Sequence, residues 1–249
     1  MTGRRCSAAS AFSRRRRECD EGSGKISGVG PETRDALLLS LRVAILATLL
    51  NALVGVPLAW VLARRRFPGR AVLDLVVTVP LILPPTVTGY YLIVLFGRRG
   101  WLGAPLYQLT GWSVAFTWYA AVVAATIMAL PLLVRTAKAA FESVDRDLER
   151  AAYTLGRSEW RTAVEVTLPL ARNGILAGLV LAFARALGEF GATLMLAGNI
   201  PGKTATVPLA IYTAVQTGED ATALLLVGIL TALSCLVIVA ANRLGARAT

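Results

Sequence analysis

The sequence contains no histidine, and this absence narrows the chemistry that the chain can perform. Histidine is the commonest general base at neutral pH and a frequent metal ligand. The three cysteines, Cys6, Cys19 and Cys235, show no paired spacing that would indicate a disulfide framework or a metal site. We therefore expect no catalytic residues, no metal and no cofactor in this chain, and a membrane-bound enzyme is a weak interpretation of it.

Charged residues are also scarce, and acidic residues are the scarcer kind. Charged residues make up 16% of the 249 positions, with 26 basic and 15 acidic side chains. Hydrophobic residues make up 55% and the mean hydropathy is +0.61, whereas a soluble domain usually holds about 45–50% apolar residues. Because the basic residues lie between apolar runs, nucleic acid is not expected as a partner despite the net charge of +11. The composition predicts a membrane protein.

Five apolar stretches are long enough to cross a bilayer as helices. A helix needs about 20 apolar residues to span roughly 30 Å of hydrocarbon. The stretch 205–215 is too short to cross, so an interfacial or re-entrant helix is expected there. The fold class is therefore an all-α membrane protein with about five transmembrane helices, surrounded by lipid. The predicted spans are 36–62, 71–96, 112–134, 173–196 and 221–241.

Residues 1–31 form a basic tail, and residues 32–249 form one predicted transmembrane domain. The tail is rich in arginine, glycine and serine and has too few apolar residues to bury a core, so we expect it to be disordered. It lacks the apolar segment of a signal peptide. A translation start near Val29 is a second interpretation of this region.

Basic residues are distributed unequally over the connectors, which predicts the orientation in the membrane. Connectors on one side hold thirteen Lys and Arg residues, and those on the other side hold three. The side with more Lys and Arg usually faces the cytoplasm. The polar connector 135–172 and the C-terminus are therefore expected in the cytoplasm. With five crossings the N-terminus lies outside, although eight basic residues precede the first span, seven of them in the tail.

The polar connector 135–172 is the longest soluble segment between the spans. Asp145 and Ser158 are candidate N-caps of two short helices, because their side chains can accept from backbone N–H groups of a first turn. Gly156 is expected to end the first helix and Pro169 the second. Two short helices joined at a glycine would form a compact projection at the membrane surface.

Small residues and a Leu-Pro pair in this connector have the spacing of a known signature. They are Ala151-Ala152, then Gly156 after three residues, then Val166-Thr167-Leu168-Pro169 after nine more. This pattern resembles the loop of bacterial ABC importer permeases, which reads E-A-A, three residues, G, nine residues, I-x-L-P. In that family the loop is the coupling helix that docks into a groove of the ATPase subunit. An amphipathic connector without a partner is the alternative interpretation.

The resemblance implies an ATPase-coupling site in this connector. Arg150 stands where the family has its glutamate, and Glu149 precedes it, from where its carboxylate could reach a basic partner. The residues of the predicted site are Glu149, Arg150, Ala151, Ala152, Gly156, Leu168 and Pro169.

The resemblance narrows to the molybdate permease branch and covers nearly all of 31–241. The segments that carry it are Phe67-Pro68-Gly69, 79–85, Gly89-Tyr90, 97–100 and 182–192. It implies a type I ABC importer permease in the cytoplasmic membrane, with two copies of the chain, two ATPase subunits and an external solute-binding protein. ATP would be hydrolysed by the partner subunit, since 198–204 has only three residues between its glycines where a phosphate-binding loop needs four. Tungstate and sulfate permeases are similar, so these anions remain alternatives.

Two features inside the predicted spans are candidates for a translocation pathway. Arg185 and Glu189 lie four residues apart, so they share a predicted helix face and can pair. Charges within a bilayer usually face protein or water. Pro84 and Pro85 remove two backbone donors and are expected to break the second span. A packing role, as a neutral pair and a kink, is the alternative interpretation of each feature.

A rival function from another class is an ATP-independent secondary transporter or channel. Such proteins commonly show inverted repeats or a larger number of spans. Neither feature is found among the five predicted spans, so the ATP-driven importer is the favoured interpretation.

Overall fold

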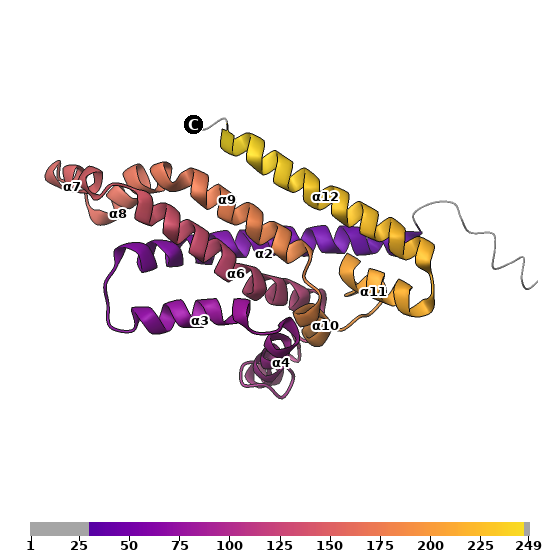
Figure 1. Cartoon of the computed structure of the whole chain (residues 1–249). Helices are drawn as coiled ribbons and strands as arrows, with labels where there is room; N and C mark the ends of the chain where they lie inside the picture. The colour runs from indigo at the N-terminus through magenta and orange to yellow at the C-terminus, as the bar shows by residue number, and fades with distance from the viewer. Residues whose placement is uncertain (1–29, 247–249) are drawn as a thin grey trace, which may run out of the picture.

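The computed structural model describes residues 30–246, and every regular element in this range is helical. Figure 1 shows α2, α6, α9 and α12 running roughly along one direction, with α7 and α8 at one end and α11 at the other. Residues 1–29 of the predicted disordered tail 1–31, and with them the alternative start at Val29, lie outside the described residues, whereas Pro31 begins α2. The helices are α2 Pro31–Arg64, α3 Arg70–Ile82, α4 Pro85–Phe96, α5 Gly103–Thr110, α6 Trp118–Ser143, α7 Arg146–Thr154, α8 Glu159–Thr162, the π-helical turn η1 Ala163–Thr167, α9 Leu168–Leu187, α10 Gly191–Ala197, α11 Val207–Thr217 and α12 Asp220–Ala246.

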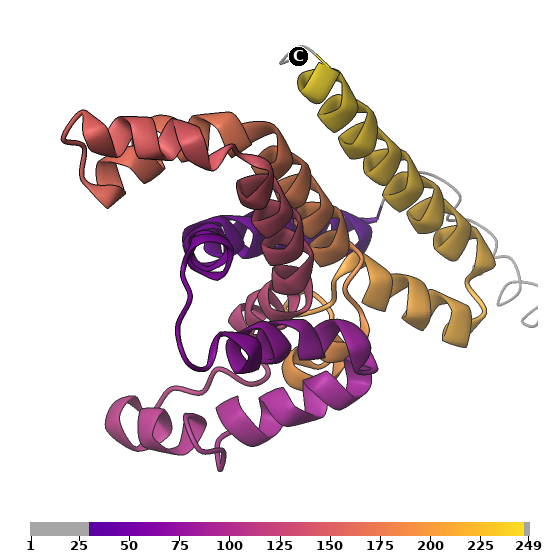
Figure 2. The same ribbon diagram turned by 60° about the vertical axis from the view of Figure 1, so that its left-hand side comes forward.

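The described residues contain four helical segments that are long and apolar enough to cross a membrane. These are α2, α6, the continuous segment Glu159–Leu187 and α12, and the bent pair of α3 and α4 makes a fifth. The prediction of an all-α fold with about five spans is confirmed. The apolar stretch 205–215 is likewise found as a short helix, α11. Figure 2 shows α12 at the edge of the molecule, where it contacts α9 and α11.

The core lies where α6 packs between α2 and α9. The buried face of α6 consists largely of alanines, which allow helix backbones to approach closely in a membrane. Glycines on both neighbours extend this close contact. A Cβ on Gly55 of α2 or on Gly178 of α9 would meet the side chain of Leu133 at 3.0 Å. The side chain of Leu133 therefore packs against both glycines, in the space that a Cβ would occupy. This contact fixes how α2, α6 and α9 are aligned along one another.

The second predicted span is broken, as its prolines indicate. α3 and α4 meet at an angle of 119°, and Pro84 and Pro85 occupy the N-cap and first position of α4. Proline lacks an N–H group, so it fits the first turn of a helix without loss, whereas at an interior position it removes a backbone hydrogen bond. The chain therefore ends α3 at Ile82 and begins α4 in a new direction.

The fourth predicted span, 173–196, is also broken, and here the prediction of one continuous helix was wrong. α9 ends at Leu187, and α10 begins at Gly191 after three residues that are not helical. The expectation that Pro169 ends the second short helix was wrong as well. Pro169 lies in the first turn of α9, and α8, η1 and α9 continue into one another as the segment Glu159–Leu187. Proline at the start of a helix costs little, so this sequence signal has two meanings.

Candidate functional site

The polar connector folds into a helical hairpin at one end of the molecule, which we name the α7–α8 knob (residues 145–167). The Asp145 side chain accepts from the N–H of Asp147 at 2.9 Å, and the Ser158 hydroxyl accepts from the N–H of Arg161 at 3.5 Å. Gly156 has a φ of +79° directly after α7, a conformation that favours glycine. Both predicted N-caps and the predicted glycine end of α7 are confirmed.

The signature residues divide into an exposed and a buried set. Arg150 is largely exposed and pairs with Asp147 within α7 at 2.9 Å. Ala152 and Glu149 are buried against the rest of the chain. The exposed members are Arg150, Ala151, Gly156, Leu168 and Pro169.

Glu149 does not project from the knob. The expectation that its carboxylate reaches a basic residue of an outside partner was wrong. Its carboxylate forms an ion pair with Arg64 Nη2 at 3.0 Å and accepts from the hydroxyl of Thr167 at 2.6 Å. The residue is only 9% exposed. Its basic partner is therefore an arginine of the same chain, at the end of α2.

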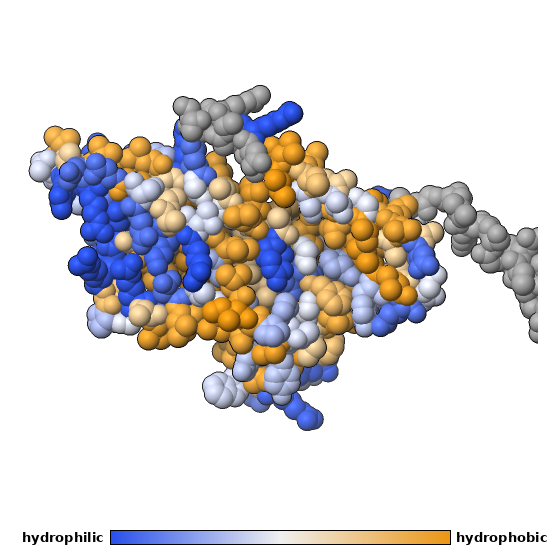
Figure 3. Space-filling view, viewed as in Figure 1, coloured by the Kyte–Doolittle hydropathy of each residue, from blue (hydrophilic) through white to orange (hydrophobic). Residues whose placement is uncertain are grey.

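The knob exposes apolar side chains among its charges. Leu155 is 83% exposed, Trp160 70% and Val164 56%. Partial burial, and then the neighbouring carboxylates Glu149 and Glu159, raise the pKa of Tyr153 above its ordinary value. Figure 3 shows hydrophilic residues gathered over this end and an apolar band over the middle of the molecule. Exposed apolar groups in a polar setting are typical of a surface that another protein covers.

A second group of predicted residues meets near the breaks of the spans. Arg185 Nη1 lies 2.7 Å from Glu189 Oε2, so the predicted pair forms. Glu189 lies beyond the end of α9, and its other oxygen accepts from the N–H of Ala192 in α10 at 2.8 Å. Its carboxylate therefore connects α9 to α10 and satisfies an otherwise free donor of the α10 first turn.

The break between α3 and α4 lies beside the break between α9 and α10, because α4 packs directly on α10. A Cβ on Gly191 would meet Pro85 Cβ at 2.8 Å, and a Cβ on Gly89 would meet Met195 Cβ at 2.7 Å. Only glycine permits backbones this close. The proline break and the Arg185–Glu189 break thus form one irregular region between helices.

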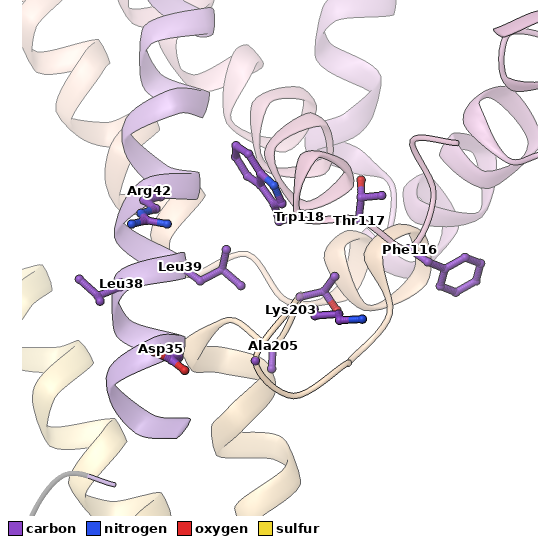
Figure 4. A pocket seen from close by; sticks show the side chains of 11 residues that line it. Asp35, Leu38, Leu39, Arg42, Phe116, Thr117, Trp118, Lys203 and Ala205 are labelled. Atoms are coloured by element: carbon purple, nitrogen blue, oxygen red, sulfur yellow. The ribbon is translucent and has the colours of Figure 1, made fainter. Parts of the chain in front are cut away.

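A cavity of about 560 Å³ lies at the end of α2 that is opposite the knob. Figure 4 shows Asp35 and Arg42 on α2 and Lys203 on the loop before α11 around this cavity. Phe116, at the entry to α6, also lines it and has a φ of +61°, which is uncommon for a residue with a side chain. Arg42 and Lys203 were not expected to share a site, since nothing in their spacing relates them. The only available signal was a charge inside an apolar run.

The chain matches one known family over most of its length. Residues 55–249 match the binding-protein-dependent transport system inner membrane component family. This chain belongs to that family. It is accordingly a multi-pass permease of the inner membrane.

Individual relatives agree with the family match. The permease is 52% identical over 190 residues to the molybdenum transport system permease protein ModB of Escherichia coli, covering 76% of this chain and 83% of that protein. It is 38% identical over 210 residues to the sulfate transport system permease protein CysW of Synechococcus elongatus, covering 83% and 73%.

A solved structure supports the fold of the permease. An inward-facing form of the MetNI methionine ABC transporter matches with a TM-score of 0.70 at 17% identity, covering 89% of this chain and 98% of that chain. At this identity the similarity concerns the fold alone. It confirms the predicted type I importer architecture.

Proposed function

We propose that this permease is the transmembrane subunit of an ATP-driven importer of molybdate. The 52% identity to a molybdenum permease over most of both chains carries the choice of anion. The 38% identity to a sulfate permease makes sulfate, another tetrahedral dianion, the second candidate, and tungstate has the same shape and charge.

The energy for import comes from a separate ATPase that binds the α7–α8 knob. The exposed Leu155, Trp160 and Val164 of the knob offer apolar contacts, and Arg150 of the same knob is exposed as well. ATP hydrolysis takes place on that partner, and an external solute-binding protein delivers the anion. Binding of ATP favours one conformation of the ATPase pair, which shifts the permease between inward-facing and outward-facing states.

A second copy of the chain completes the pathway. The face of α3 with Val72, Leu75 and Val76 is exposed and apolar, as is the face of α4 with Tyr90 and Tyr91. In a membrane, such apolar faces contact either lipid or a second copy of the chain. The irregular region at Pro84, Pro85, Arg185 and Glu189 lies beside α4, so a twofold arrangement places two such regions around one route.

Reconstitution tests the proposal. The permease is purified with its ATPase and binding protein, placed in vesicles with internal ATP, and offered radiolabelled molybdate, tungstate or sulfate outside. We expect uptake of molybdate that requires ATP and both partners. Vesicles with the permease alone that accumulate molybdate would contradict the ATP-driven mechanism, and uptake of sulfate in preference to molybdate would contradict the choice of anion.

Gly156 provides a matched pair of variants for the coupling part of the proposal. A β-branched side chain at a positive φ costs about 1–2 kcal/mol, whereas asparagine tolerates this conformation. Nothing lies within 4 Å of a Cβ at this position, so the effect is on the turn and not on packing. We expect Gly156→Val to reduce co-purification of the ATPase and Gly156→Asn to preserve it. Equal co-purification of both variants would count against the knob as the docking element.

A further inference from the structure

The C-terminal end of α2 contacts the α7–α8 knob at three places. Arg64 pairs with Glu149 at 3.0 Å, and Arg65 pairs with Glu159 at 2.7 Å. The rings of Trp60 and Trp160 stack with their centroids 5.6 Å apart. Among the described residues 30–246, every ion pair between the knob and the rest of the chain ends on α2.

The Arg64 pair differs from the others in its burial. The side chains of Arg64 and Glu149 are 8% and 11% exposed, whereas those of Arg65 and Glu159 are 55% and 40% exposed. An exposed ion pair contributes little and is easily separated, but breaking a buried one leaves an uncompensated charge. The Arg64 contact is therefore the one that resists separation when the knob is pushed or pulled.

Hydrogen bonds extend the Arg64 contact through the whole knob. Arg64 Nη2 also donates to the carbonyl oxygen of Val144, directly before α7, at 3.0 Å. Glu149 accepts from the hydroxyl of Thr167, the last residue of η1, directly before α9. One guanidinium thus holds the entry of the knob, α7 and the exit of the knob in a fixed arrangement.

We propose that Arg64 is a positioning residue that fixes the α7–α8 knob to α2, so that a displacement of the knob moves α2 as well. The proposal rests on the function above, because the ATPase supplies the displacement. α2 has 34 residues and is about 51 Å long at 1.5 Å per residue. It reaches from the knob to the cavity lined by Asp35 and Arg42 at its other end. α2 is thereby a rigid connection between the ATPase contact and the far side of the membrane.

The test compares two arginine variants at the same end of the molecule. Arg64→Met removes the buried pair, and Arg70→Met removes the more exposed pair of Arg70 with Glu142, 3.6 Å apart, which joins α3 to α6 without touching the knob. For Arg64→Met we expect normal co-purification of the ATPase and continued ATP hydrolysis, with molybdate imported per ATP reduced about tenfold. Arg70→Met is expected to behave as the unmodified permease.

A second variant guards against misfolding, since Arg64→Met leaves Glu149 buried without its partner. The double variant Arg64→Met, Glu149→Gln removes both charges, and the glutamine can still accept from Thr167. We expect it to fold and to be uncoupled in the same way. If it imports as much molybdate per ATP as Arg70→Met, or if it no longer captures the ATPase, the proposal is overturned.

Cross-linking provides an independent readout. Cysteines replace Arg65 and Glu159, whose side chains pair at 2.7 Å across this contact, in a chain whose Cys6, Cys19 and Cys235 are serine, and a short bis-maleimide joins them. Because the two elements move as one body, we expect import to survive the cross-link; arrest of import would contradict the proposal. An unmodified permease that neither captures the ATPase nor imports molybdate marks the failure of the proposed function instead.

Discussion

Glu189 is a deeply buried acidic residue, and among the described residues its ion pair is with Arg185. It is 2% exposed, and Arg185 lies 2.7 Å away. We expect Arg185→Met to destabilise the fold by about 3–5 kcal/mol, because the carboxylate then remains buried and unpaired. The double variant Arg185→Met, Glu189→Gln should recover most of this loss, since glutamine can still accept from the N–H of Ala192. Thermal unfolding of the purified permease in detergent measures both effects.

Import by the double variant shows whether the Arg185–Glu189 pair serves helix packing or takes part in transport. If Arg185 offsets the charge of a passing anion, the double variant folds but imports molybdate about tenfold or more slowly. If the pair only fixes α9 against α10, the double variant imports normally. Arg185→Ala with unchanged assembly and unchanged import would contradict both roles.

Glu189 and Glu149 show which contacts can be predicted from the spacing of residues in the sequence and which cannot. The four-residue spacing of Arg185 and Glu189 predicted their pair, because such positions are neighbours on a helix. The partner of Glu149 is Arg64, 85 positions earlier in the chain. No local pattern relates them, so the sequence left Glu149 free for an outside partner, and only the packing of α2 against the knob removes it from the surface.

At the scale of elements, the break between α3 and α4 positions the irregular region. Replacing Pro84 and Pro85 by alanine restores two N–H groups and allows α3 to continue straight. We expect this double variant to lose the contact of α4 with α10 and to be less stable by about 1–3 kcal/mol, with import reduced. Pro57→Ala is the control, because Pro57 is exposed and lies within α2 without ending it. Thermal unfolding that is equal for both variants would show that the prolines do not determine the bend.

The ends of helices were predicted correctly where the residue type indicates a helix end and nothing else. Asp145, Ser158 and Gly156 act only at helix ends, and all three were predicted correctly. Pro169 can end a helix or begin one, and the break at residues 188–190 contains no proline at all. Hydropathy predicts that a segment is buried in a membrane, but the packing of α10 against α4 decides that the segment is broken.

At the scale of the whole molecule, the distribution of basic residues and the position of the knob predict the same orientation of the permease in the membrane. The knob with its basic residues lies at one end of α2, and the loop with Lys203 and the helix α11 lie at the other (Figure 1). The excess of Lys and Arg on the knob side predicts that this end faces the cytoplasm. The ATPase can reach the knob only in this orientation, so the entire mechanism depends on it.

Labelling of single cysteines tests the orientation. Leu155 is 83% exposed on the knob, and Glu219 is exposed in the turn between α11 and α12. With the three native cysteines replaced by serine, we expect a membrane-impermeant maleimide to label Glu219→Cys on intact spheroplasts, and Leu155→Cys only after permeabilisation. Because the permease is produced without its ATPase for this test, both side chains are open to solvent, and a difference between them reports the side of the membrane and not burial. Labelling of Leu155→Cys from outside would place the knob beyond the reach of a cytoplasmic ATPase and overturn the importer mechanism.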